Sequence, residues 1–505
     1  MELKPGELTF GQLAEFYYGD DAITLCESCW SGIDASRDVV LKLIERDETV
    51  YGLNTGFGLL ANQKISSEDL AQLQINLVRS HSAGTGPLMN DRVVRMIMLL
   101  KATSLARGYS GVRSNVVKIL IDCINAGLSP CIPEQGSVGA SGDLAPLAHM
   151  SLALIGEGQF CRDGEILEAA SGLAAAGIEP LKLEAKEGLA LINGTQASTA
   201  LAITALFGAQ RTFRAAISAG ALSVDAAKGS DTPFDPRIHA IRNHETQIKC
   251  AEVYRELLSG SEIRESHRDC SRVQDPYSLR CQPQVMGACL TSLKHAQEVL
   301  VCEANAVSDN PLVFGDDDSM LSGGNFHAEP VAMVADQIAI ALAEIGAFSE
   351  RRTALLIDKH LSELPPFLIQ DGGLNSGFMI PQVTAAAIAS ENKHLATPCS
   401  TDSIPTSANQ EDHVSMATYA ARRLHKMVAN VNSILAIELL SAAQGIDFRK
   451  GLKTSPLLQK LQNLIRERAD FYDVDRSFHQ EIERLELLIA GDELDVVLQC
   501  NRIFS

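Results

Sequence analysis

The stretch VAMVADQIAIALAEIGAFSERRTALLID, Val331 to Asp358, decides the fold class. It contains no proline, and apolar residues recur near a three-and-a-half-residue period at Val331, Val334, Ile338, Leu342 and Ile345. This period places them on one face of a long α-helix. A helix of this length cannot bury its apolar face within one small lobe. It therefore predicts a central bundle, a type of core that subunits can share.

Other segments also have helical patterns. A second proline-free stretch follows Glu411 and extends to Gly445. Asn90 and Gly108 bracket a third predicted helix. Ser66 or Ser67 can cap a fourth, whose apolar face consists of Leu70, Leu73, Leu77 and Val78.

Strand-like alternation is scarce in this sequence. One short hairpin is expected at EGQFCRDGEI (157–166), with Asp163 and Gly164 as its turn. The fold prediction is therefore mainly α, with a loop-rich N-terminal lobe (1–200) and a long-helix C-terminal lobe (201–505).

Composition and charge exclude some classes of partner. Of the 505 residues, 46% are hydrophobic but only 5% are aromatic, so the core is expected to be aliphatic and alanine-rich. The formal net charge of −20 would repel phosphate backbones, and no basic run offsets it. Nucleic acid is therefore not an expected partner.

Membrane insertion and secretion are not expected either. The charge-free segment from Gly188 to Gln210 is long enough for a membrane helix, but it contains several Asn, Gln, Ser and Thr residues that lipid would not solvate. The first residues, MELKPGELTFGQ, do not resemble a signal peptide. Twelve cysteines then indicate reduced thiols and a cytoplasmic location. The lone CxxC of Cys26 and Cys29 has no second pair for zinc, so both are interpreted as packing residues.

The most unusual segment is GSVGASGDL, Gly136 to Leu144. A phosphate-binding loop would need a lysine, which is missing here, and Asp143 stands where a hydrolase nucleophile elbow needs glycine. A plain glycine turn is one remaining interpretation. The other is chemical, because the Gly142 amide nitrogen can attack the Ala140 carbonyl carbon if the backbone is held tightly.

That attack and the loss of one water would close a five-membered imidazolone ring. Loss of a second water from Ser141 would leave an exocyclic methylene. The product would be a strong electrophile formed without an added cofactor.

The segment GSVGASGDLAPLAH resembles the signature of the aromatic amino acid ammonia-lyases and aminomutases, which carry this methylidene-imidazolone (MIO) group. Further blocks similar to this family follow in order along almost the whole chain. They are YGLNTGFG (51–58), LINGTQ (191–196), QDPYSLRCQPQ (274–284), SDNP (308–311), GGNFHAEP (323–330) and SANQEDHVSM (407–416). The resemblance implies a fumarase- and aspartase-like helical fold, a homotetramer, and active sites composed of residues from more than one subunit.

The resemblance also assigns roles to individual residues. Tyr51 would be the general base that removes the β-proton, although it could simply pack beside a flexible turn. Tyr277 would form hydrogen bonds near the reacting amine. Arg280 would bind the α-carboxylate, although it could equally form a salt bridge. The spacing of Tyr277 and Arg280 allows both side chains to project from one helical turn.

Three further residues would surround the substrate. Asn193 and Gln274 would complete the polar shell, although Asn193 could instead cap a turn with Gly194. Phe326 would pack near the electrophile and the substrate ring, although most phenylalanines are core residues.

Two positions indicate which amino acid the chain would accept. Ser80-His81 resembles the histidine-selective group of the family, although a lone histidine on an apolar helix face is usually a satisfied core residue. Glu411 could face an imidazole, which has N–H donors, whereas a bare phenyl ring would leave its charge without a partner. Its alternative role is a first-turn acid that complements a helix dipole. L-histidine is therefore the expected substrate, with trans-urocanate and ammonia as products.

Rival functions stay open at this point. The nearest is a tyrosine or phenylalanine ammonia-lyase or 2,3-aminomutase with the same electrophile. Another is a catalytically silent helical scaffold, and a third is a fumarase-like carboxylate lyase that lacks the electrophile. No metal site is expected, because His267 and Cys270 form only a lone pair of donors.

Overall fold

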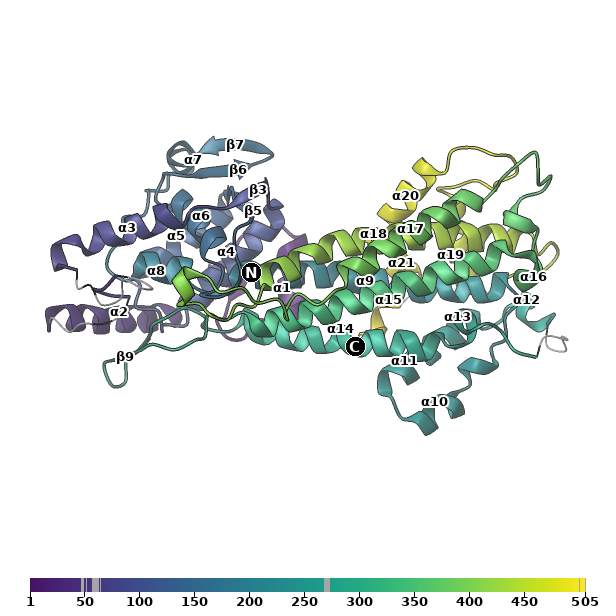
Figure 1. Cartoon of the computed structure of the whole chain (residues 1–505), viewed down its shortest axis with the longest axis horizontal. Helices are drawn as coiled ribbons and strands as arrows, with labels where there is room; N and C mark the ends of the chain where they lie inside the picture. The colour runs from purple at the N-terminus through teal and green to yellow at the C-terminus, as the bar shows by residue number, and fades with distance from the viewer. Residues whose placement is uncertain are drawn as a thin grey trace. The chain divides into compact units, whose positions relative to one another are not determined.

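The computed structural model describes residues 1–46, 50, 52–56, 63, 65–267, 273–498 and 500–504. Helices dominate these residues and strands are short, as Figure 1 shows. The prediction of a mainly α fold is therefore confirmed.

The chain divides into two compact units. Unit 1 comprises Met1–Thr204, Gln297–Asp336 and Pro398–Arg422, and unit 2 comprises Ala205–Ala296, Gln337–Thr397 and Arg423–Ser505. A single boundary at residue 200 would separate the two later segments of unit 1 from its first segment. The reason is that four long helices cross the boundaries between the units. They are α9 (Gln196–Ala226), α14 (Gln282–Ala304), α15 (Glu329–Ile357) and α18 (Ala417–Asp447).

The other helices of unit 1 precede α9 in the chain. They are α1 (Phe10–Tyr18), α2 (Cys29–Glu45), α3 (Leu70–His81), α4 (Asp91–Leu105), α5 (Ser114–Asn125), α6 (Leu144–Leu154), α7 (Ala169–Ala175) and α8 (Glu187–Ile192). Helices α3, α6 and α8 pack against one another. The Asn90 side chain caps α4 by accepting a hydrogen bond from the Arg92 N–H, as expected from the sequence.

The strands of unit 1 form small separate sheets. The strands are β1 (Glu2–Leu3), β2 (Thr24–Leu25), β3 (Thr85–Leu88), β4 (Ser129–Pro130), β5 (Pro133–Gln135), β6 (Gln159–Arg162), β7 (Glu165–Glu168), β8 (Leu312–Phe314) and β9 (Ser319–Leu321). Strands β6 and β7 form the predicted hairpin, in which Arg162 pairs with Glu165 across the Asp163-Gly164 turn. Strand β5, which pairs with β3 in the antiparallel sense, ends just before the glycine-rich segment at 136–144.

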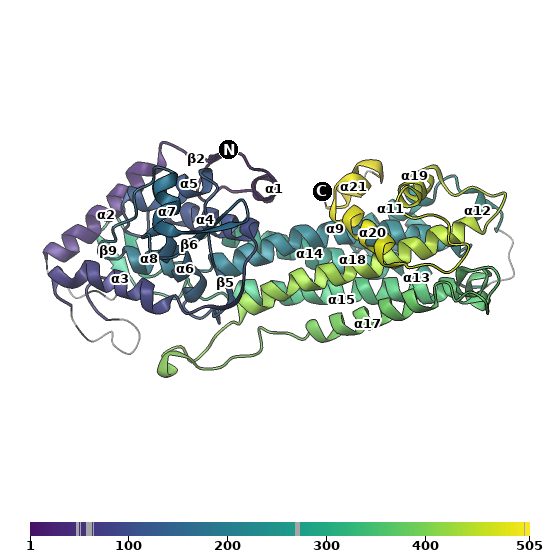
Figure 2. The ribbon, with the colours of Figure 1, turned by 90° about the horizontal axis from the view of Figure 1, so that it is seen from above.

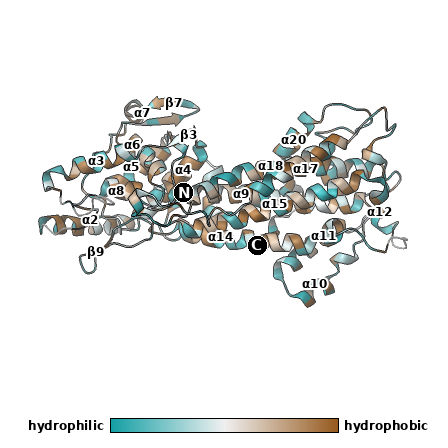
Figure 3. Ribbon diagram, viewed as in Figure 1, coloured by the Kyte–Doolittle hydropathy of each residue, from teal (hydrophilic) through white to brown (hydrophobic). Residues whose placement is uncertain are grey.

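Unit 2 is a helical bundle. Beside the long helices it contains α10 (Pro236–Arg242), α11 (Glu245–Leu258), α12 (Glu262–Glu265), α13 (Tyr277–Arg280), α16 (Lys359–Ser362), α17 (Met379–Leu395), α19 (Pro456–Arg466), α20 (His479–Ala490) and α21 (Glu493–Leu498). Within it α9, α14, α15 and α18 run side by side (Figures 1 and 2). Their surfaces alternate between hydrophobic and hydrophilic residues, as amphipathic helices require (Figure 3).

Close packing and one buried ion pair hold this bundle together. A Cβ on Gly287 of α14 would lie 2.6 Å from the Gln247 Cα of α11, so only glycine permits this approach. Arg352 of α15 forms a buried ion pair with Glu438 of α18, with 2.5 Å between Nε and Oε1. Removing one partner of such a pair would leave an uncompensated buried charge.

Two helices, α15 and α18, are long and apolar enough to span a membrane by length and composition alone. Most of the residues in their apolar stretches are buried inside the protein. Burial of this kind is expected for the core helices of a bundle. The charge-free segment at 188–210 likewise forms α8 and the buried first half of α9.

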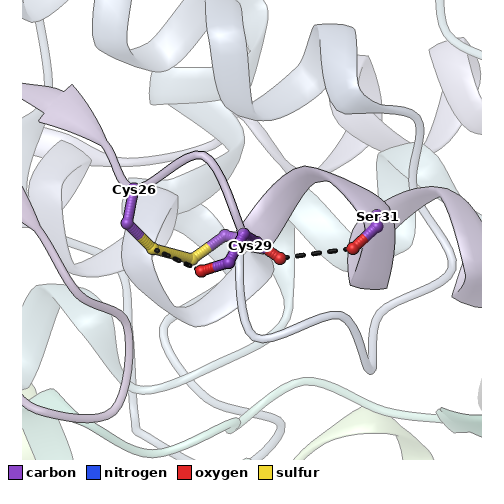
Figure 4. The surroundings of a disulfide bond; sticks show 4 residues. Cys26, Cys29 and Ser31 are labelled. Carbon is purple, nitrogen blue, oxygen red and sulfur yellow. Dashed lines mark hydrogen bonds between the residues drawn. A yellow bond between two sulfur atoms is a disulfide. The ribbon is translucent and has the colours of Figure 1, made fainter.

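Cys26 and Cys29 form a disulfide bond, so the interpretation of both as packing cysteines was wrong (Figure 4). Their Cα atoms lie 5.8 Å apart because the Cys29 N–H donates to the Cys26 carbonyl and closes a tight turn before α2. Eight further cysteines of the described residues do not form disulfide bonds.

Candidate active site

The glycine-rich segment at 136–144 leads from β5 into α6 and lies in unit 1. At its centre Gly142 has a φ of +73° and pairs with Gly194 in an isolated β-bridge. The Asp143 N–H donates to the Gly194 carbonyl at 2.7 Å. A Cβ on Gly142 would lie 2.2 Å from the Gly194 carbonyl oxygen. Both the left-handed backbone and the close approach therefore require glycine at position 142.

The buried carboxylate of Asp143 anchors the segment. It accepts hydrogen bonds from the Ser198 N–H at 2.6 Å and from the Ser198 hydroxyl at 2.8 Å, both in the first turn of α9. The hydroxyls of Ser137 and Thr418 donate to its other oxygen at 3.0 and 2.6 Å. A carboxylate at a helix N-terminus is favoured by the helix dipole. Asp143 thus ties the loop to both α9 and α18.

Two further contacts fix the start of the loop. The Ser415 hydroxyl donates to the Gly139 carbonyl at 2.9 Å, and the Met416 N–H donates to the Val138 carbonyl at 2.8 Å. The residues before α18 therefore lie directly against the Ala140-Ser141-Gly142 tripeptide.

Ser141 has a partner on each side. Its hydroxyl donates to the Glu411 carboxylate at 2.5 Å, and its carbonyl accepts from the Asn193 side-chain amide at 2.8 Å. The backbone carbonyl of Asn193 in turn accepts a hydrogen bond from the Lys101 ammonium at 2.8 Å. Burial lowers the pKa of Lys101 to about 7, although the negative charge of Asp309 opposes this shift.

Glu411 lies in a loop and not in the first turn of a helix, so its alternative role as a dipole-complementing acid does not apply. Helix α18 begins only at Ala417. The backbones of Glu411 and Thr406 form a reciprocal pair of hydrogen bonds, and the Thr406 hydroxyl donates to the Glu411 carboxylate at 2.7 Å. Burial raises the pKa of Glu411, but the Ser141 and Thr406 hydroxyls outweigh it and hold this pKa below its ordinary value.

His81 is the last residue of α3 and is half-buried. Its Nδ1 lies 3.0 Å from the Ser80 hydroxyl oxygen. Burial lowers the pKa of His81, and the nearby Glu411 carboxylate only partly offsets this effect. His81 and Glu411 are therefore close enough to interact electrostatically.

The remaining predicted site residues fall in three places. Tyr51 lies outside the described residues. Phe326 is half-buried and lies just before α15. It belongs to unit 1, as do Asn193, Ser141 and the rest of the loop. Gln274, Tyr277 and Arg280 belong to unit 2.

The residues of unit 2 are accessible. Tyr277 is 68% exposed, and Gln274 is exposed as well. The Arg280 guanidinium lies over the Tyr277 ring, 4.6 Å from its centroid, so both side chains do project from the single turn of α13. Stacking leaves the edge of a guanidinium free for a carboxylate.

A sequence model of the aromatic amino acid lyase family matches residues 8–467 of the chain. The chain belongs to this family. The match extends over both units, which confirms the resemblance inferred from the sequence blocks.

Two bacterial relatives are similar to this lyase over almost their whole length. Histidine ammonia-lyase from Vibrio vulnificus is 58% identical over 490 residues, which cover 97% of this chain and 96% of that protein. Histidine ammonia-lyase from Yersinia enterocolitica is 58% identical over 506 residues and the full length of both chains.

Solved structures of the family are also similar. Histidine ammonia-lyase from Trypanosoma cruzi matches with a TM-score of 0.91 and 40% identity, covering 99% of this chain and 95% of that chain. Tyrosine aminomutase from Streptomyces globisporus matches with a TM-score of 0.93 and 36% identity, covering 98% of each chain.

The sequence did not reveal the residues of this lyase whose hydrogen bonds fix the glycine-rich loop against the rest of unit 1. Asp143 stood within the quoted motif, but only its neighbours were assigned roles. Ser415 likewise stood within the quoted block at 407–416 without a role. Thr418 and Lys101 are remote in sequence from the loop, and a lone hydroxyl or lysine gives no pattern that could reveal them. A buried lysine within an apolar helix was the one available signal, since lysine is almost never fully buried without a partner.

Proposed function

We propose that the chain eliminates ammonia from L-histidine to give trans-urocanate, the opening step of histidine breakdown. The observation that carries this proposal is the contact between Glu411 and Ser141, with His81 nearby. A carboxylate suited to a substrate imidazole lies against the residue that would become the reactive centre, and the His81 imidazole lies near that carboxylate. The names and identities of the relatives support the same substrate.

The electrophile would form from the chain itself. The Gly142 nitrogen would attack the Ala140 carbonyl carbon and one water would leave, closing the imidazolone ring. Ser141 would then lose its hydroxyl and its α-hydrogen as a second water, which leaves the exocyclic methylene. The left-handed turn at Gly142 and its bridge to Gly194 support this cyclisation, because they hold the tripeptide in a compact conformation. Once formed, the MIO group would supply an electrophilic carbon for the substrate amine or ring.

The residues of the chain would bind and orient the substrate. The Arg280 fork would take the α-carboxylate in two-point fashion, and Tyr277 would form a hydrogen bond near the amine. Asn193 and Gln274 would complete the polar shell, and Phe326 would pack against the ring. Tyr51 would accept the β-proton as general base, which requires the site to lower the proton affinity of its phenol.

Selection of histidine would rest on His81 and Glu411. A carboxylate with a lowered pKa stays ionised at neutral pH and can accept an imidazole N–H. Against a phenyl ring, the same desolvated charge would have no partner, which disfavours phenylalanine.

A homotetramer is proposed as the active form. Its support is the exposure of Tyr277 and Gln274, which leaves these groups available to a neighbouring copy of the chain. We further propose a cytoplasmic location, with neither nucleic acid nor membrane as partner, on the grounds of the net charge of −20 and the burial of the two long apolar helices.

The test is a substrate panel with product identification. Purified protein is mixed with L-histidine, L-tyrosine or L-phenylalanine, and near-ultraviolet absorbance is followed. Urocanate from histidine alone supports the proposal. A cinnamate product from another substrate would keep the electrophile and refute the assignment of His81 and Glu411.

An aminomutase is the second candidate, favoured by the similarity to tyrosine aminomutase. It would return a β-amino acid in place of free ammonia. Assaying ammonia in the same mixtures distinguishes the two, because a mutase releases little of it.

A further inference from the structure

Three metal-binding side chains gather in unit 1 at the start of α15 and the loop before α18. They are His327, Glu329 and His413, and one ligand atom from each lies within 4.8 Å of the others. No metal site was expected from the sequence, where His267 and Cys270 form only a lone pair of donors, and 86 positions separate His327 from His413. Folding brings the two segments together.

One oxygen of the Glu329 carboxylate in this cluster, Oε2, is buried and accepts no hydrogen bond from the described residues. The closest cation-forming group is His413, whose Nε2 lies 3.9 Å away, beyond hydrogen-bond distance. The Glu329 side chain as a whole is 31% exposed, so this side chain, one of whose oxygens has no hydrogen-bond partner among the described residues, is accessible to an incoming metal ion.

The two histidines of the cluster contact each other. Their rings stack at a centroid distance of 5.5 Å with 7° between planes. The His327 Nε2 also lies 3.3 Å from the His413 carbonyl oxygen, so the two segments are in direct contact. A metal-binding histidine typically donates its second ring nitrogen to a backbone carbonyl or a carboxylate, and this hydrogen bond fixes the orientation of the ring.

We propose that His327, Glu329 and His413 bind one divalent transition-metal ion of the zinc type. Two imidazoles and one carboxylate are a ligand set that zinc accepts, with a fourth position left for water. Zinc bonds of about 2.0–2.1 Å place tetrahedral donors about 3.3 Å apart, so the three atoms must draw together. His413 is exposed and can make this movement by rotating its ring.

The ion would link two segments that carry predicted site residues, namely the start of α15 and the loop before α18. Phe326 immediately precedes His327, and Glu411 lies two positions before His413. Tying these segments together would restrict both and stabilise the folded chain by mass action. The ion is thus assigned a positioning and stabilising role, and it takes no part in the elimination. This inference does not depend on which amino acid the chain accepts.

Metal binding to the full-length protein is the direct test. Zn²⁺ is titrated against the protein in competition with a chromophoric chelator, after any bound metal has been removed. We expect one ion per chain, and at least tenfold weaker binding in His327→Ala and His413→Ala. His244→Ala is the matched control, because His244 is exposed and belongs to unit 2, and it should bind like the wild type.

Two further measurements distinguish the loss of metal ligands from misfolding of a variant. Glu329→Gln keeps the shape of the side chain and removes its charge, so it should weaken Zn²⁺ binding with an unchanged far-ultraviolet circular dichroism spectrum. Zn²⁺ should also raise the melting temperature of the wild type and His244→Ala, but not that of His413→Ala. Absence of saturable binding, or equal binding in the wild type and all three cluster variants, would overturn the proposal.

Discussion

The hydroxyl of Ser141 donates to the carboxylate of Glu411 at 2.5 Å, although 270 residues separate them in the chain. This contact connects the proposed electrophile with the proposed specificity residue. The loop before α18 supplies Glu411 and also holds the backbone of the glycine-rich segment through Ser415. Formation of the reactive centre and selection of the substrate are therefore expected to depend on the same loop.

Replacing Ser141 with alanine should abolish ammonia release from histidine. Alanine lacks the hydroxyl whose loss creates the methylene, so the second dehydration cannot occur. Steady-state absorbance measures the effect, with Ser31→Ala on the exposed surface of α2 as the control. Turnover of Ser141→Ala at the control rate would refute the assignment of the electrophile.

Replacing Glu411 with glutamine should lower kcat/KM for histidine by about one to two powers of ten. Hydrogen bonds to charged groups contribute about 1.5–3 kcal/mol, and the change removes the charge while keeping the shape. Glu391→Gln, at an exposed position of α17, serves as the control. Kinetics unchanged from the control would mean that the Glu411 carboxylate does not contact the substrate.

Replacing Gly142 with alanine should prevent formation of the electrophile and leave the helical fold intact. A Cβ at this position would lie 2.2 Å from the Gly194 carbonyl oxygen, so the bridge between the two residues must open. Gly177 is the matched control, because its φ is +69° and a Cβ there would meet nothing within 4 Å.

Gly177→Ala should cost only the strain of a left-handed alanine, about 1–2 kcal/mol. Intact mass, activity and circular dichroism are measured for both glycine variants. An active Gly142→Ala protein would contradict the requirement for glycine in the loop.

Stability should depend on pH through Lys101. Burial lowers its pKa in the folded chain from 10.5 to about 7. Between these two values the unfolded chain binds more protons than the folded one, so this residue favours folding increasingly as the pH rises from 7 towards 10.5. The gain is about 1.4 kcal/mol for each pH unit in that window.

The measurement is the melting temperature of the wild type and Lys101→Met across this range, with Lys118→Met as an exposed control. The wild type should become more stable relative to Lys101→Met as the pH rises, whereas its difference from the control should stay constant. A constant difference from Lys101→Met would indicate that Lys101 is not desolvated.

Local patterns in the sequence predicted much of this structure. The apolar period from Val331 to Ile345 predicted α15, and Asp163-Gly164 predicted the β6–β7 hairpin, because both signals depend on neighbouring residues. The loop tripeptide was found for the same reason. The Glu411–Ser141 contact was not predictable, since no local signal records which remote segment folds onto a loop.

The predictions that failed depended on tertiary context. The alternative role of Glu411 as a first-turn acid assumed a helix that begins near this residue, whereas its backbone pairs with Thr406 and α18 begins only at Ala417. Cys26 and Cys29 were interpreted as packing residues because a lone CxxC says nothing of the turn that brings its sulfurs together.

The most direct test of the central claim is the intact mass of the purified wild-type chain. If Ala140, Ser141 and Gly142 form the electrophile, the mass will fall short of the sequence mass by two water molecules. Peptide mapping should place that loss at 140–142. A chain with the full sequence mass that still releases ammonia from histidine would contradict the account.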